Sequence, residues 1–129
     1  MKIVCRYVTG EYLEDGYLLA GYTPRSKFAL RQGVEYVVNG MCMMYPGVLL
    51  YLVQPLAGQF PSWCPASLFE IADPQLPQDW CFSFRKIGNV GSVHAVWGYE
   101  RLVCDEEHFD GLSEGNSVDF QYFSKITNS

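Results

Sequence analysis

Residues 28–53 constrain the fold of this chain more than any other stretch. Two runs rich in Val, Leu, Tyr and Met flank the tripeptide Tyr45-Pro46-Gly47. Proline followed by glycine marks a turn, and the flanking residue types are those enriched in strands. The run from Val48 to Val53 is apolar or aromatic at every position, which is typical of a strand buried on both faces. The sequence therefore predicts a long β-hairpin with its tip at the Pro-Gly turn and with Leu50 in the core.

The composition and the other short runs predict a mostly β fold. The chain has 129 residues, of which 49% are apolar and 16% aromatic, enough for one folded domain with a proper core. Aromatic and β-branched residues favour strands. Strand-like runs outside the hairpin cover residues 3–8, 17–20, 69–71, 80–85 and 92–97.

The order of these runs resembles the layout of SH3-like barrels. A glycine-bounded loop over residues 10–16 precedes tight antiparallel strands, and Pro65 can open a single helical turn. We predict an α+β, mostly β domain over residues 1–129. Residues 1–99 are expected to form a small antiparallel SH3-like barrel of about five to six strands, and residues 100–129 an acidic, helical C-terminal appendage.

The C-terminal appendage has the signals of two helices. Asp105 is followed by two acids, which suits the N-terminus of a helix because the helix dipole favours negative charge there. Asn116 and Ser117 can cap a second helix, whose residues Val118, Tyr122 and Ile126 lie four apart. The same stretch also alternates in polarity, so an edge strand over residues 116–126 is the alternative.

Negative charge is concentrated in the same region. The formal net charge is −5, which argues against a nucleic-acid partner. Residues 100–119 hold seven acids and one base, a net charge of −6, whereas the rest of the chain is net +1. Such a block is either a solvated face or a surface complementary to a basic partner.

The five cysteines and the N-terminus favour a cytoplasmic protein. The cysteines, at positions 5, 42, 64, 81 and 104, are odd in number and widely spaced. We expect them to be reduced and mostly buried, with a redox-sensing thiol as the alternative. No apolar run approaches the roughly 20 residues that span a bilayer, and Arg6 interrupts any signal-peptide core. We therefore expect no membrane partner.

The sequence nominates no catalytic, metal or cofactor site. The histidines are His94, in a predicted strand, and His108, in the acidic segment; neither has neighbours with the spacing of metal ligands. The Gly88–Gly91 turn lacks the lysine of a phosphate-binding loop. We therefore expect a non-enzymatic protein without a cofactor, although carboxylates can also come together only in the fold.

Aromatic side chains near the acids complete the candidate partner-binding surface. The tryptophans at positions 63, 80 and 97 suit the core or its edge better than a ligand platform. The aromatics most expected outside the core are Tyr12, Phe60, Trp63 and Phe109. The candidate partner-binding residues are Glu106, Glu107, Phe109, Asp110, Glu114 and Tyr12, because aromatics beside charges are frequent hot spots.

Four stretches carry a resemblance to a class of known proteins. They are residues 28–38 (FALRQGVEYVV), 63–69 (WCPASLF), 98–102 (GYERL) and 107–112 (EHFDGL). Together they resemble small cytosolic bacterial immunity proteins, the partners of secreted toxins, with an SH3-like barrel. The resemblance implies a non-enzymatic protein that binds and blocks a toxin domain, and it assigns no residue a role.

The expected function is therefore inhibition of a protein partner with a basic surface, such as a toxin. The alternatives are a small enzyme whose site forms only in the fold, and a phage-type or structural assembly protein. The sequence leaves the oligomeric state open.

Overall fold

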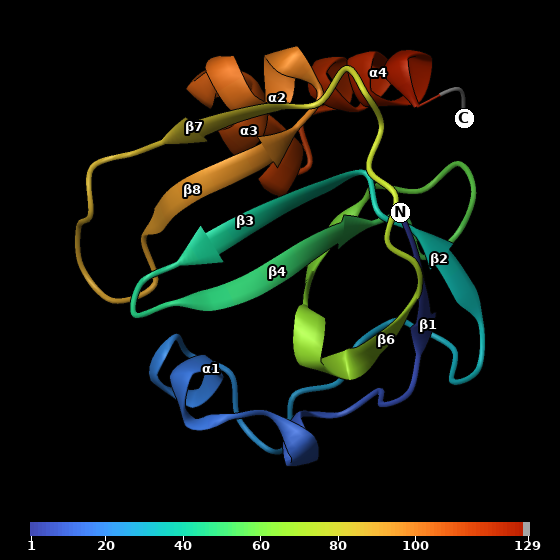
Figure 1. Ribbon diagram of the computed structural model, residues 1–129, viewed down its shortest axis with the longest axis vertical. Helices are drawn as coiled ribbons and strands as arrows, with labels where there is room; N and C mark the ends of the chain where they lie inside the picture. Colours follow the sequence, from blue (N-terminus) through green and yellow to red (C-terminus); the bar gives the residue numbers. More distant parts are fainter. Residues whose placement is uncertain (128–129) are drawn as a thin grey trace.

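The chain folds into two antiparallel sheets and a set of C-terminal helices (Figure 1). The computed structural model describes residues 1–127. The three-stranded sheet has the order β2 (Glu35–Val37), β1 (Lys2–Cys5), β6 (Phe69–Asp73). The five-stranded sheet has the order β5 (Ser62–Pro65), β4 (Val48–Val53), β3 (Gly40–Met44), β8 (Val93–Gly98), β7 (Cys81–Phe84). The helices are α1 (Asp15–Leu19), α2 (Glu100–Cys104), α3 (Glu106–Ser113) and α4 (Ser117–Ile126), with 3-10 turns η1 (Gly10–Tyr12) and η2 (Ala66–Leu68).

The predicted hairpin is confirmed at its tip but is shorter than expected. Strands β3 and β4 pair around Tyr45-Pro46-Gly47, where the Tyr45–Pro46 peptide is cis and Gly47 has φ 134°. Residues 35–37, in contrast, pair with β1 in the other sheet. The Val38 N–H donates to the Met1 carbonyl and the Asn39 N–H to the Leu52 carbonyl. The chain therefore passes from one sheet to the other between these two residues.

Strand β4 is buried on both faces, as its sequence predicts. It lies between β3 and β5, and Leu50 is 3% exposed. On the opposite face, Tyr51 lies against Phe69 of β6, with ring centroids 6.0 Å apart. This contact packs the three-stranded sheet onto the β4 side of the larger sheet.

The prediction of a closed SH3-like barrel with five to six strands is wrong. There are eight strands in the described residues, and β1, β2 and β6 pair only with one another. The two sheets are joined by side-chain packing rather than by a ladder, so they do not close into a barrel. The mostly β, α+β class of the prediction is correct.

The run at residues 17–20 forms helix α1 and not the predicted strand. Tyr17 is buried, and its hydroxyl donates to the Leu49 carbonyl at 2.7 Å. The next two residues, Leu18 and Leu19, are both exposed. Two consecutive exposed residues do not fit the alternation of a strand, but a run of four apolar residues cannot reveal this. The expected strands over residues 69–71, 80–85 and 92–97 are confirmed as β6, β7 and β8.

A notch of two glycines positions the C-terminal helices. Gly40 of β3 and Gly98 of β8 are directly opposite each other. A Cβ atom at either position would lie within 2.6–2.7 Å of the Leu102 side chain of α2. Gly40 therefore permits the close approach of a helix, and Leu102 is fully buried.

The acidic C-terminal segment is helical, as predicted. Asp105 caps α3, and the Asn116 side chain accepts from the N–H groups of Val118 and Asp119 to cap α4. The edge-strand alternative is wrong because this cap starts a helix. The face of α4 is nevertheless not the one expected: Val118 and Ile126 are exposed, and Phe123 is fully buried.

All five cysteines are free, and they differ in burial enough for their reactivity toward a thiol reagent to differ. Cys104 is exposed, and Cys5, Cys42 and Cys64 are buried. Burial raises the pKa of both Cys42 and Cys64 to about 12. The thiolate is the reactive form. Cys42 and Cys64 should therefore react slowly with thiol reagents, because a reagent cannot reach them and because they ionise only at high pH.

We expect a thiol reagent such as DTNB to label Cys104 of the native protein first. The partly buried Cys81 should react more slowly, and Cys5, Cys42 and Cys64 only after unfolding. A Cys104→Ser variant should lose the fast phase. Rapid native labelling of all five thiols, or a fast phase that survives this substitution, would contradict the burial pattern.

Candidate functional site

Helix α3 begins with a cap that also orients its histidine. The Asp105 carboxylate accepts a hydrogen bond from the backbone N–H of His108 at 3.2 Å. Glu106 and Glu107 occupy the first turn, where the helix dipole stabilises negative charge. The cap directs the His108 side chain inward, toward the junction of α2, α3 and α4.

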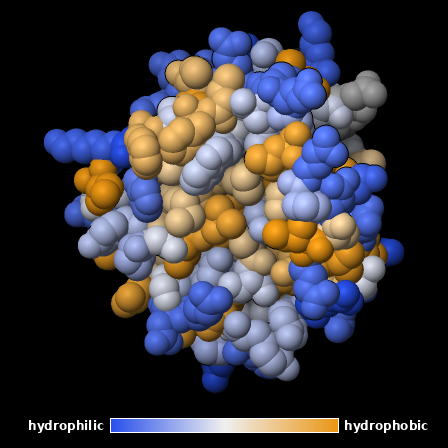
Figure 2. All heavy atoms as spheres, in the orientation of Figure 1, coloured by the Kyte–Doolittle hydropathy of each residue, from blue (hydrophilic) through white to orange (hydrophobic). Residues whose placement is uncertain are grey.

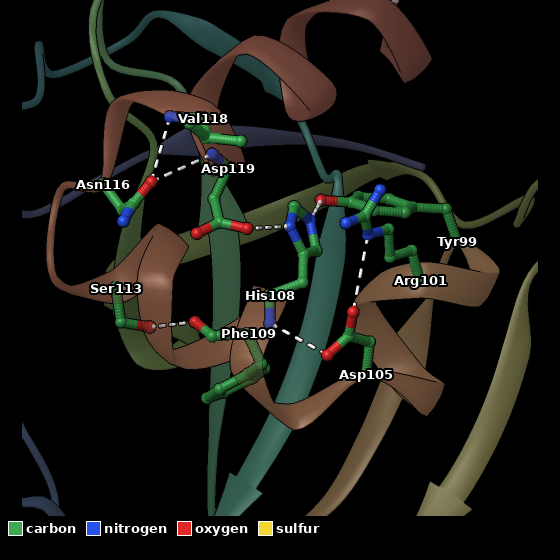
Figure 3. Close-up of polar contacts among 9 residues, drawn as sticks. All are labelled: Tyr99, Arg101, Asp105, His108, Phe109, Ser113, Asn116, Val118 and Asp119. Carbon is green, nitrogen blue, oxygen red and sulfur yellow. Dashed lines mark hydrogen bonds and ion pairs between the residues drawn. The ribbon is translucent and has the colours of Figure 1, made fainter.

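A largely buried chain of three polar side chains, in which only the Asp119 carboxylate reaches the surface, joins the helices at this junction (Figure 3). The His108 ring, 1% exposed, lies between Tyr99 and Asp119. The distance from Tyr99 Oη to His108 Nε2 is 2.6 Å, and that from His108 Nδ1 to Asp119 Oδ1 is 2.8 Å. The carboxylate can only accept, so Nδ1 carries a proton, and in the neutral imidazole Nε2 accepts from the tyrosine O–H. Burial raises the pKa of Tyr99, which keeps its hydroxyl protonated and able to donate.

Gly111 permits the approach of α4 to α3 that this chain requires. Gly111 is buried, and a Cβ atom there would collide with Oδ2 of Asp119. Gly111 is the position at which the Asp119 carboxylate passes α3 to reach His108.

Phe109 is part of the core, so the prediction that it lies outside is wrong. It is 6% exposed and packs on Trp63 of β5 with ring centroids 5.3 Å apart. The Arg85 guanidinium lies 4.4 Å from the other side of the ring. Helix α3 turns Phe109 and Leu112 toward the sheet, which leaves its acids on the outer side. Phe109 thus anchors the helix and is not available as an exposed contact for a partner.

The outer side of the three helices forms an acidic hollow of about 440 Å³. Arg101 lines it too, with Nε 3.5 Å from Asp105 Oδ2 and its guanidinium 4.4 Å from the Tyr122 ring centre. His108 lies at its floor. The carboxylates that line the hollow are those of Asp105, Glu107, Asp110, Glu114 and Asp119.

Three of these carboxylates have no cationic partner within residues 1–127. Asp105 pairs with Arg101 and Asp119 with His108. No ion pair or side-chain hydrogen bond of the described residues involves Glu107, Asp110 or Glu114, all of which are exposed. Unpaired carboxylates gathered around a concave surface are suited to accept from the Lys or Arg side chains of another molecule.

The remaining predicted site residues do not join the hollow. Glu106 is exposed, but its Oε1 lies 3.8 Å from Arg85 Nε, and it does not line the hollow. Tyr12 is 60% exposed and stacks on Tyr7. Its 3-10 turn η1 and helix α1 lie at the end of the molecule opposite to α2–α4 in Figure 1. Tyr12 and the acids therefore cannot contact one small partner segment together.

Sequence reasoning did not nominate Arg101, Asn116 or Asp119 for this site, and it set His108 aside. The spacing of Asp105 and His108, three residues apart, is that of a helix cap and its third residue. This spacing is the signal in the sequence that could have placed His108 in the first turn of a helix. The contact between His108 and Asp119 joins two helices and leaves no pattern in the sequence.

No match was found when the chain was compared with protein-family models, curated proteins and solved structures. Within residues 1–127, no three or more His, Cys, Asp and Glu side chains converge as metal ligands would. None of the helices in the same residues combines the length and apolarity needed to cross a membrane. His94 Nδ1 is buried without a hydrogen-bond partner in the described structure.

Proposed function

We propose that this chain is a non-enzymatic cytoplasmic binding protein that inhibits a protein partner with a basic surface. Lys or Arg side chains of the partner enter the acidic hollow. The observation that carries the proposal is the set of three unpaired carboxylates, Glu107, Asp110 and Glu114, around that hollow. Their negative charge accelerates association with a basic surface and selects against acidic ones.

The scaffold under the hollow supports binding without rearrangement. Leu102 is seated in the glycine notch, Phe109 packs on Trp63, and His108 bridges to α4. A surface held by buried contacts loses little conformational freedom when it binds. The partner therefore meets carboxylates whose backbone positions are already fixed.

The partner class that the resemblance to immunity proteins implies is a toxin domain. A toxin that acts on nucleic acid carries a basic cleft, and an acidic surface can occupy such a cleft. The non-enzymatic part of the proposal is supported by the state of His108. His108 is only 1% exposed, so its ring nitrogens are not accessible to a substrate.

A hexa-arginine peptide can test whether the hollow takes basic side chains. In an NMR titration, we expect the largest shift changes at the backbone amides of residues 105–119 and progressive loss of binding as salt rises. A triple variant with Glu107→Gln, Asp110→Asn and Glu114→Gln should weaken binding several-fold. Exposed charges contribute little to folding, so its stability should be nearly unchanged.

The matched control removes the same charges elsewhere. Glu11→Gln, Glu35→Gln and Asp79→Asn neutralise two glutamates and one aspartate that are exposed and outside the hollow. This control should bind the peptide nearly as the natural protein does. Equal weakening in both triple variants would mean that only net charge matters, and the proposed role of the hollow would be rejected.

A further inference from the structure

Arg101 is the one Lys or Arg residue among residues 100–119, and its side chain lines the acidic hollow. Its guanidinium lies 4.4 Å from the ring centre of Tyr122, and its Nε lies 3.5 Å from Oδ2 of Asp105. A guanidinium is attracted to the face of an aromatic ring and to a carboxylate. Arg101 thus makes the two contacts that an arginine from another molecule would seek in this hollow.

The Asp105 carboxylate is held in place without the help of Arg101. Its Oδ1 accepts from the backbone N–H of His108 at 3.2 Å, which is the cap of α3, while Oδ2 faces Arg101 (Figure 3). A capping carboxylate is fixed by the helix that it starts. Oδ2 should therefore keep its position when the arginine leaves.

The Tyr122 ring is also held by residues other than Arg101. It packs edge-on against the His108 ring, with centroids 5.2 Å apart, and lies 6.1 Å from the Tyr99 ring. Both of these rings are buried, and they are hydrogen-bonded to each other. The aromatic surface under Arg101 is thus supported by the core of the helical junction.

Arg101 itself is held weakly. Its side chain is 45% exposed and that of Asp105 is 41% exposed, and exposed ion pairs contribute little to stability. The two residues are four apart with the arginine first, which is the weaker order for an ion pair on a helix. Hydrophilic side chains predominate along the margin of the molecule where α2–α4 lie (Figure 2, in the orientation of Figure 1). Arg101 can therefore move into solvent at small cost, whereas the groups that it contacts stay in place.

We propose that the Tyr122 ring and the Asp105 carboxylate form a guanidinium subsite, which Arg101 fills in the free protein and an arginine of the partner takes on binding. The inference rests on the proposed function and adds that the partner presents arginine rather than lysine at this position. A guanidinium is planar and weakly hydrated, so it stacks on an aromatic ring, whereas an ammonium is compact and strongly hydrated. The unpaired carboxylates of the hollow attract either cation, and the subsite distinguishes them.

An Arg101→Ala variant empties the subsite and allows a direct test. Ethylguanidinium carries the atoms that this substitution removes, and ethylammonium has the same charge without the planar group. In an NMR titration at constant ionic strength, we expect ethylguanidinium to shift the ring resonances of Tyr122 several-fold more than ethylammonium does. The natural protein should respond several-fold less to ethylguanidinium, because Arg101 already lies over the ring.

Two matched variants separate the subsite from net charge. Arg25→Ala removes one exposed arginine outside the hollow and should behave as the natural protein does. Adding Asp105→Asn to Arg101→Ala removes the carboxylate charge but keeps a side chain that can cap α3. This double variant should lose most of the response to ethylguanidinium, and circular dichroism can verify that it is folded.

Equal responses of Arg101→Ala to the two cations would overturn the subsite, and so would an equal response of Arg25→Ala to ethylguanidinium. A double variant that is folded and still prefers ethylguanidinium would exclude Asp105 from it. The proposed function has a separate test in the hexa-arginine titration of the natural protein. Binding of that peptide without a preference for ethylguanidinium in Arg101→Ala would reject the subsite alone, and the reverse result would reject the proposed function alone.

Discussion

Leu50→Ala is expected to lower the free energy of unfolding by about 2–5 kcal/mol, the range for truncating a fully buried leucine. Leu50 is 3% exposed on β4, an inner strand of the five-stranded sheet. Its neighbours across the ladders are Cys42 on one side and Pro65 on the other. Both are themselves buried, so the surroundings have little freedom to collapse into the cavity.

Urea denaturation followed by tryptophan fluorescence measures this loss directly. Tyr12→Ala is the control, because Tyr12 is 60% exposed and its ring stacks on the exposed ring of Tyr7. Its substitution should lower the free energy of unfolding by less than about 1 kcal/mol. Equal losses in the free energy of unfolding for the two variants would mean that Leu50 on the β3–β4 hairpin is not part of the core.

Asp119→Ala is expected to lower the free energy of unfolding by about 1–3 kcal/mol, the penalty for leaving a buried polar group unpaired. The substitution removes the acceptor of His108 Nδ1, and the His108 side chain is buried. Glu114→Ala, an exposed acid with no ion pair in the described structure, is the control and should change stability by less than about 0.5 kcal/mol.

A double-mutant cycle separates the hydrogen bond from other effects of the substitution. His108→Ala combined with Asp119→Ala should be less destabilising than the sum of the single variants. The expected coupling energy is about 0.5–3 kcal/mol, as found for residues in direct contact. Additive effects would mean that the chain of Tyr99, His108 and Asp119 does not act as one unit in holding α4 to α3.

The features of the fold that could be predicted are those with a strong local cause. The β3–β4 tip has a Pro-Gly turn, and helices α3 and α4 have Asp105 and Asn116 as caps. A cap needs only a few neighbouring residues, so it is visible in a sequence. The apolar run of β4 is also unambiguous, because both faces of the strand are covered.

The features that could not be predicted depend on contacts between distant residues. Tyr17-Leu18-Leu19-Ala20 fits a strand as well as a helix, and the helix is decided by packing onto Leu49. The separation of residues 35–37 from the hairpin depends on β1, more than thirty residues earlier in the chain.

The candidate site, like the fold, could be predicted only in part from the sequence. The concentration of acids could be read from residues 100–119, and the structure gathers most of them around one hollow. Which acids line it depends on the rotation of each helix, which places Glu114 at the hollow and Glu106 beside Arg85. Phe109 was misplaced because an aromatic flanked by acids on a helix can face either way until the sheet beneath it is known.

We propose that the acidic hollow steers and holds a basic protein partner, and the association rate with the partner that the immobilised chain captures from its source cell tests this role. Stopped-flow kinetics should be recorded at two salt concentrations, one below and one above about 0.15 M, where the Debye length is about 8 Å. We expect the association rate constant to fall as salt rises. We also expect a several-fold reduction in the variant with Glu107→Gln, Asp110→Asn and Glu114→Gln, and none in the control with Glu11→Gln, Glu35→Gln and Asp79→Asn. Unchanged association kinetics in the hollow variant would contradict the proposed role of the hollow, and the acidic segment would then be only a solvated surface.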